Sequence, residues 1–219
     1  LPASSAASDV YKRQYNDSAL FGSVVRDSQR ATLILFSVAF IWGMTFIWMK
    51  QALAAANSHL IGVDGRWVAM HFVAFRFLIG SFFTIVLLRS SRSGFNDPEV
   101  WRGGFSLGLI LILGFLVQMV GLTDVTPAVS AFLTSLYVVF TAIIGVAIGR
   151  QRFTPFMLLG VVLATFGAGW ISGPPRLEFG VGEWLTVLSG FLFALHIIVT
   201  DGVTRVVDPI QSTGTMMVT

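Results

Sequence analysis

Arg76 has the strongest chemical character in this sequence, because it interrupts a long uncharged run. The run covers about residues 67–88, and Arg76 lies roughly 14 Å from either end at 1.5 Å per helical residue. An arginine that deep in a membrane costs about 2.5–3.5 kcal/mol, and such residues face the bundle interior and mark a pathway. Three roles fit: a tie to neighbouring carbonyls, direct binding of an anion, or the lining of a pathway or gate.

The partner of Arg76 is not a carboxylate of a predicted span, because none of the spans given below contains Asp or Glu. The alternatives are a backbone carbonyl, a hydroxyl, the amide of Gln118, a carboxylate outside this sequence or an anionic substrate. Each would supply the acceptor that a guanidinium needs in an apolar medium.

Two further polar residues, Thr45 and His196, occupy matched places in a weak internal repeat. Residues 40–50 align with residues 191–201 at an offset of 151, with two identities but a shared order of aromatic, small, polar and charged residues. If the two copies are inverted, Thr45 and His196 lie on opposite sides of the membrane midplane and flank one cavity. His196 could exchange a proton near neutrality, or it could simply hydrogen-bond between helices.

Polar and aromatic groups for a small-molecule pocket also occur on other predicted helices. Ser130, Thr134 and Thr141 recur at helical spacing and share one face. That face could line a pocket or hydrogen-bond to a neighbouring helix. The substrate-pathway candidates are Arg76, Trp42, Thr45, Gln118, Ser130, Thr134, Tyr137 and His196.

The elements that must position these residues are membrane-spanning helices. Of the 219 residues, 11 % are charged and 55 % are hydrophobic, whereas a soluble domain carries about a quarter charged residues. The apolar residues gather in uncharged runs of about twenty, which is long enough to cross a bilayer. We therefore predict an all-α, polytopic transmembrane helix bundle, with a loop at 89–102 and helices at about 31–53, 67–88, 103–122, 126–149, 153–172 and 184–200.

Three regions follow one another along the chain. Residues 1–30 form a polar lead-in, whose first 14 residues resemble the translation of a sequencing adapter. Residues 31–172 form a five-helix unit. Residues 183–219 begin a second copy that we expect to be truncated, because the offset places the counterpart of Trp67 at position 218.

The distribution of Lys and Arg predicts the orientation. With the amino terminus in the cytoplasm and the adapter-like residues 1–14 left out, the inner segments hold 8 of these residues and the outer segments hold 3. We expect a multi-pass protein of the cell (inner) membrane with a cytoplasmic amino terminus. Because five spans is an odd number, the second copy enters from the opposite side, which predicts an inverted repeat with a site near mid-membrane and alternating access.

Small residues recur every four positions on three predicted helices, a pattern that favours close helix packing but also reflects how common they are in membranes. They are Gly104/Gly108, Gly145/Gly149 and Gly160/Ala164/Ala168. Lys50 stands at a helix end, and we expect its side chain to extend to the membrane interface.

The sequence carries no signal for catalysis, a metal or nucleic acid. It has no HExxH, GxSxG or Walker motif, no carboxylate pair within a predicted span, and no cysteine. His59, His71 and His196 lack the spacing of metal ligands. The net charge of +3 comes from basic residues at helix ends, not from a patch. We predict no enzymatic activity, cofactor, metal or nucleic-acid partner.

Four segments carry a family resemblance: FIWGMTFIWMKQAL, Phe75-Arg76-Phe77, TPAVSAFLTSLYVVFTAIIG and RQRFTPFMLLGVVLATFGAGW. In this order they resemble the EamA-type domain of the drug/metabolite transporter superfamily, over residues 31–172 and more faintly over 182–219. The resemblance implies a ten-helix carrier of two inverted units in the lipid bilayer, with both termini cytoplasmic. It implies a secondary transporter for a small-molecule substrate such as an amino acid, another metabolite or a drug, with a homodimer as one possible assembly. The alternative function is a non-transporting membrane scaffold, or an enzyme for lipid-linked substrates.

Two positions depart from the family pattern. The family shows a proline where Tyr137 stands, so the resemblance carries no helix kink over to this position. It often shows a Glu where Gln151 stands, so we do not expect an inner-surface ion pair built on that carboxylate. The Trp-Gly and Arg positions of the family map onto Trp42, Gly43 and Arg76.

Overall fold

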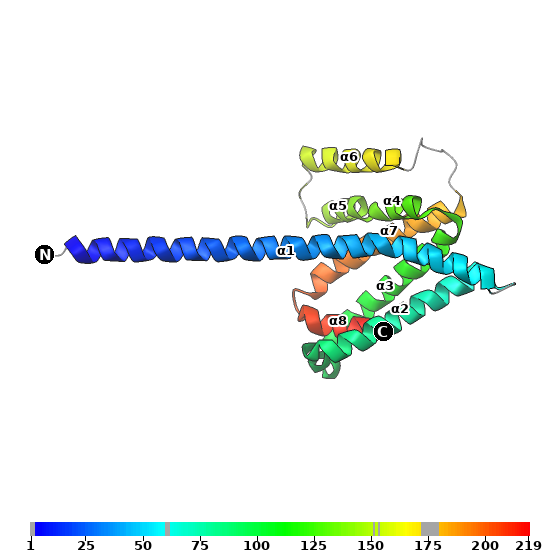
Figure 1. The fold of residues 1–219 in the computed structure, drawn as a ribbon, viewed down its shortest axis with the longest axis horizontal. Coiled ribbons are helices and arrows are strands. Elements are labelled where there is room, and N and C mark those ends of the chain that lie inside the picture. The colour runs from blue at the N-terminus through cyan, green and yellow to red at the C-terminus, as the bar shows by residue number, and fades with distance from the viewer. Residues whose placement is uncertain (1–2, 60–61, 151, 153, 172–179) are drawn as a thin grey trace. The chain divides into compact units, whose positions relative to one another are not determined.

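Every regular element in the described part of the chain is a helix (Figure 1). The computed structural model describes residues 3–59, 62–150, 152, 154–171 and 180–219. The elements are α1 (Ala3–His59), α2 (Gly65–Leu87), the 3₁₀ helix η1 (Arg89–Asn96), α3 (Pro98–Asp124), α4 (Pro127–Ser135), α5 (Tyr137–Ala147), α6 (Pro155–Ile171), α7 (Val181–Val203) and α8 (Pro209–Val218). The predicted all-α class is confirmed. Leu1–Thr45 and Phe46–Thr219 are two compact units, which we describe separately.

Most of these helices have the length and composition of membrane spans. Five described segments qualify: Ser28–Ala56, Gly65–Leu87, Pro98–Asp124, Pro127–Ala147 and Val181–Val203. The predicted helix at 153–172 is present as α6, whose 17 residues stand at the short limit of about 17–25 for a span, so its crossing stays a prediction. Large apolar side chains such as Leu78, Phe82 and Phe156 are exposed on the helices, as contact with lipid requires.

The boundaries differ from the sequence prediction at several places, including the end of α1 at His59 and not near residue 53. α1 begins at Ala3 and runs through the polar lead-in, where no proline or glycine between residues 3 and 21 breaks a helix. The predicted loop at 89–102 contains η1 and the start of α3, where Asp97 accepts a hydrogen bond from the Glu99 amide at 2.8 Å and caps the helix. The tail after residue 203 also contains a helix, α8, which begins at Pro209 and not near position 218.

α3 is the central helix of the unit Phe46–Thr219, because it packs on α2, α7 and α8. A Cβ on Gly121 would lie 2.8 Å from the carbonyl oxygen of Gly182 in α7, and a Cβ on Gly182 would lie 3.0 Å from that of Gly121. The two backbones therefore touch, and they can do so only because both residues lack a side chain. Gly104 and Gly108 are in equally close contact with α8, which confirms the packing predicted for that pair.

The other predicted packing glycines behave differently. Gly149 ends α5 with a φ of +70°, and its amide and that of Arg150 bond to the carbonyls of Val146 and Gly145. Its role is therefore that of a helix cap, and the packing prediction for Gly149 is wrong. A Cβ on Gly160 would meet no described atom within 4 Å. The side chains of Ala164 and Ala168 lie outside the described residues.

Lys50 joins the last part of α1 to the corner between α3 and α4. Its Nζ atom donates to the carbonyl oxygens of Leu122 at 2.8 Å, Thr123 at 3.1 Å and Val125 at 2.9 Å. The last carbonyls of a helix have no partner within it, and a cation there also matches the helix dipole. We expected the Lys50 side chain to extend to the membrane interface, and the sequence did not predict these three hydrogen bonds.

We expect Gly121→Ala to lower the free energy of unfolding by about 1–3 kcal/mol, because the added methyl group would displace α7. The measurement is the temperature at which half of the detergent-solubilised protein is lost from its size-exclusion peak after heating. Gly160→Ala is the matched control, and it should be neutral or stabilising by up to about 1 kcal/mol. Equal midpoints for Gly121→Ala and the unmodified protein would contradict the α3–α7 contact.

We expect Lys50→Met to destabilise the protein by about 1–3 kcal/mol in the same assay, because three carbonyl oxygens lose their donor. Arg66→Met removes a positive charge from an exposed side chain at the start of α2 and should leave the midpoint unchanged. A midpoint for Lys50→Met equal to that of Arg66→Met would refute the role of Lys50 at the end of α3.

Candidate functional site

Arg76 lies on the inward face of α2. It follows the buried residues Ala69 and Val73 at helical spacing, and its side chain is half-buried. Its guanidinium carbon lies 4.4 Å from the centroid of the Phe115 ring on α3, within the range of a cation–π interaction. Among the described residues the guanidinium has no hydrogen bond and no ion pair. The contact with an aromatic ring is therefore a partner that the sequence alternatives did not include.

Phe115 belongs to a cluster of aromatic side chains. Its ring meets Phe193 of α7 edge-on, with centroids 5.1 Å apart, and Phe77 of α2 at 5.5 Å. Phe115 and Phe193 are almost fully buried. Sequence reasoning missed Phe115, although its place one helical turn before Gln118 puts it on the same face of α3. The charge of Arg76 thus stands at the edge of an apolar, aromatic core.

Gln118, Thr134 and Ser130 form the polar part of the candidate site. Gln118 is 1 % exposed, and its Nε2 atom donates to the Thr134 hydroxyl at 3.0 Å, which ties α3 to α4. Ser130 is 0 % exposed, and its hydroxyl has no hydrogen-bond partner within the described residues. Thr141 instead donates to the Tyr137 carbonyl of its own helix at 2.7 Å. The predicted polar face is therefore split: Ser130 and Thr134 are buried in the bundle, and Thr141 bonds locally.

The predicted helix at 126–149 is interrupted in its middle, next to Tyr137. α4 ends at Ser135 and α5 begins at Tyr137, because the Leu136 amide bonds to the Leu133 carbonyl at 3.3 Å in a tightened turn. Sequence analysis carried no kink over to this position, so the break is a correction. α7 packs closely at this place: a Cβ on Gly190 would be 3.1 Å from the Thr134 carbonyl oxygen and 3.2 Å from that of Leu133. Tyr137 packs half-buried against the core.

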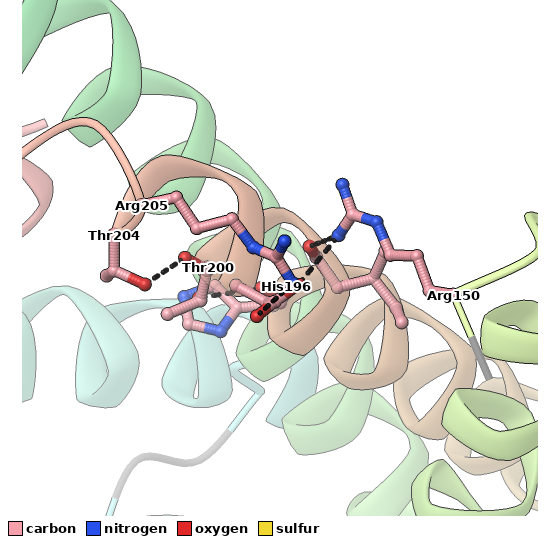
Figure 2. Close-up of polar contacts among 7 residues, drawn as sticks. Arg150, His196, Thr200, Thr204 and Arg205 are labelled. Atoms are coloured by element: carbon pink, nitrogen blue, oxygen red, sulfur yellow. Dashed lines mark hydrogen bonds and ion pairs between the residues drawn. The ribbon is translucent and has the colours of Figure 1, made fainter.

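His196 lies on α7, two turns after Ser189. Its Nε2 atom is buried, and no described residue hydrogen-bonds to it. Its carbonyl accepts from the Thr200 hydroxyl at 2.7 Å, and the Thr200 carbonyl accepts from the Thr204 hydroxyl at 2.8 Å (Figure 2). The bond between helices that we offered as the alternative for His196 is therefore not made by Nε2 within the described part of the chain.

Asp201, five residues after His196 on α7, forms an ion pair with Arg150, just after the end of α5. Its carboxylate accepts from Arg150 at 2.9 Å and from Arg205 at 3.0 Å, and Arg150 also donates to the Ile198 carbonyl at 3.2 Å. Gln151 stands where the family often has a Glu, and it lies outside the described residues. The neighbouring Arg150 nevertheless forms an ion pair, and its carboxylate partner is Asp201 of α7. The Arg150 and Asp201 side chains are 41 % and 49 % exposed, so the pair is worth about 0–1 kcal/mol.

Trp42 and Thr45 belong to the unit Leu1–Thr45, whereas the other candidates belong to Phe46–Thr219. The Thr45 hydroxyl donates to the Trp42 carbonyl at 2.6 Å, a bond within α1. The proximity of these two residues to Arg76 or His196 stays a prediction.

A separate pocket of about 580 Å³ lies beside the first turns of α2. None of its lining residues is a predicted site residue, and His71 is its one ionisable side chain; they are Ala52, Val63, Trp67, Val68, His71, Phe72 and Phe75. Within the described residues, no three His, Asp or Glu side chains are grouped as metal ligands would be.

Comparison with known proteins places this helix bundle in a family. Residues 29–173 match the EamA-like transporter family. A relative from Archaeoglobus fulgidus, described as an uncharacterized transporter, is 30 % identical over 179 residues, which is 82 % of this chain and 51 % of that protein. The chain thus spans about half the length of the curated relative it matches. No solved structure matches it. Because the family match covers most of the chain, the chain belongs to the EamA-like transporter family.

Proposed function

We propose that this chain is the first half of a carrier that moves a small metabolite or a drug across the inner membrane. Family membership carries the proposal, since the matched residues 29–173 coincide with the predicted first unit at 31–172. The match to about half of a longer relative supports a second unit that begins near residue 183. The relative is described only as a transporter, so no substrate carries over from it.

The directions of the helices support an inverted second unit. Gly182, at the start of α7, contacts Gly121 near the end of α3, so these two helices are antiparallel. Arg150, just after α5, bonds to Asp201 near the end of α7, so α5 and α7 run the same way. The third and sixth predicted spans therefore have opposite directions, as expected if α7 starts an inverted copy. Such a pair of units supports alternating access around a site near mid-membrane, with the amino terminus in the cytoplasm.

The polar groups around α3 suit a small-molecule pathway. α2, α3 and α4 place Arg76, Gln118, Ser130 and Thr134 within a few helical turns of one another, in otherwise apolar surroundings. Small-molecule sites are mostly apolar, with a few convergent polar groups. Thr45 and His196, at the matched repeat positions, and Trp42 remain predicted members of this pathway.

The rival function is a non-transporting membrane scaffold or an enzyme for lipid-linked substrates. Reconstitution of the full-length gene product in proteoliposomes separates these functions, with a panel of labelled amino acids and drugs as probes. Time-dependent, saturable uptake of one of these solutes supports the carrier. No uptake of any solute, together with chemical modification of a lipid-linked substrate, would refute it.

We expect Arg76→Gln to reduce the initial rate of uptake about tenfold or more, or about 1.4 kcal/mol, while the amount of protein in the membrane falls less than about twofold. The reason is that the variant removes the charge that lines the pathway while keeping a polar side chain in its place. Arg66→Gln, at the exposed start of α2, is the matched control and should transport normally. A parallel loss of uptake and abundance in Arg76→Gln would indicate a folding role instead.

We expect His196→Gln to flatten the pH dependence of uptake between about pH 5 and 8, because His196 is the one titratable side chain in the predicted span 184–200. The measurement is initial uptake at several external pH values. The charged groups that follow it on α7 are Asp201 and Arg205, and Asp201 also pairs with Arg150. Thr200→Val, which removes the hydroxyl that bonds to the His196 carbonyl, should leave the profile unchanged. An unaltered profile in His196→Gln would remove this residue from any proton relay.

A further inference from the structure

We infer that Arg76 binds the anionic group of the transported substrate, and that the substrate is an amphipathic monocarboxylate, a small molecule with one carboxylate and an apolar part. The inference rests on the proposed function and deepens it by naming a substrate class. Three features of the structure carry it: the free donors of Arg76, the apolar character of its surroundings, and the single charge that it supplies.

Within the described residues, no acceptor bonds to the guanidinium N–H donors of Arg76. A guanidinium presents five N–H donors in one plane, and the ring of Phe115, at 4.4 Å, contacts the cation without accepting an ordinary hydrogen bond. No oxygen atom of the described residues bonds to it. Donors left unpaired in an apolar medium are costly. A carboxylate would satisfy two of them at once, because its two oxygen atoms match the guanidinium fork.

The amide of Gln118, near Phe115 on α3, already has a hydrogen-bond partner. Gln118 lies one turn from Phe115 on α3, and its amide donates to Thr134 at 3.0 Å. Phe115, which contacts Arg76, belongs to an apolar cluster that also contains Val73, Phe77 and Phe193. A ligand held by Arg76 would therefore place its apolar part against these side chains.

The charge balance favours one negative charge on the ligand. Arg76 is the one Lys or Arg in residues 67–88, and residues 103–122 contain none. A phosphate monoester carries about −1.5 to −2 charges at neutral pH, and one arginine would leave part of that charge unpaired in an apolar site. A carboxylate carries a single charge, which Arg76 alone neutralises.

Ligand binding to the purified full-length gene product in detergent tests this inference without measuring transport. The probes are three acids with their neutral amides: phenylacetate and phenylacetamide, indole-3-acetate and indole-3-acetamide, hexanoate and hexanamide. A ligand that binds the folded state raises its unfolding midpoint by mass action. We expect at least one acid to raise the midpoint in a saturable way, while its amide does not.

Substitutions of Arg76 test whether this residue causes the rise in the unfolding midpoint. Arg76→Gln should weaken the apparent affinity for the acid about tenfold to a hundredfold, the range expected for hydrogen bonds to a charged group. Arg76→Lys keeps the cation and loses the fork, so it should prefer the acid over the amide with weaker affinity. Arg66→Gln should respond like the unmodified protein.

The inference is overturned if no acid shifts the midpoint, if acid and amide shift it equally, or if Arg76→Gln keeps the full response. Should Arg76→Gln fail to fold, Arg76→Lys decides, because unweakened affinity there would exclude fork pairing. Uptake of neutral solutes without any binding of acids would leave the carrier standing and remove only this substrate class. Binding of acids without uptake of any solute would instead count against the carrier.

Discussion

Contact between helix backbones along α3 is the constraint on which the rest of this bundle depends. Lipid tails are as apolar as leucine, so helices in a bilayer associate through close packing and not through exclusion of water. α3 meets this requirement with Gly104 and Gly108 against α8 and with Gly114 and Gly121 against α7. Because these contacts leave no space for a side chain, they set how α3 is rotated about its axis.

That rotation decides which groups meet at the candidate site. With its glycines turned toward α7 and α8, α3 presents Phe115 to Arg76 and Gln118 to Thr134. Within the described residues of the unit Phe46–Thr219, the interior thus holds the charge of Arg76, which has no hydrogen-bond partner there, and several hydroxyl and amide groups, whereas the carboxylates of this unit lie at or near helix ends. There Asp97 and Asp208 cap α3 and α8. This separation follows from electrostatics, because a carboxylate is cheap at a hydrated helix terminus and expensive at mid-membrane.

Two features of the bundle are suited to movement. The tightened turn at Leu136 divides one span into two shorter helices, and a tightened stretch within a helix often marks a hinge. The pair between Arg150 and Asp201 is exposed and weak, and Asp201 keeps Arg205 as a second partner when Arg150 leaves. The pair connects the end of α5, the fourth predicted span, to α7, the sixth. Movement of α5 away from α7 would therefore lose little energy at this contact.

The sequence by itself determined the class of the protein and the approximate place of its helices. Several uncharged runs of about twenty residues in a chain of this length are typical of membrane spans. α2 and α7 begin and end within about three residues of prediction, because charged residues and the Asp64 cap of α2 mark their ends. It also singled out Arg76, Gln118 and Thr134, since a polar group within such a run needs a specific reason to be there.

Only the tertiary structure decided the partners of these residues. Three of these contacts join positions more than thirty residues apart. They are the contact of Arg76 with Phe115, the bonds of Lys50 to the end of α3, and the ion pair of Arg150 with Asp201. The break at Leu136 lies where Gly190 of another helix approaches, and no local residue signals it. Sequence periodicity shows which residues share a face, but the rotation and crossing of each helix depend on contacts distributed over the whole bundle.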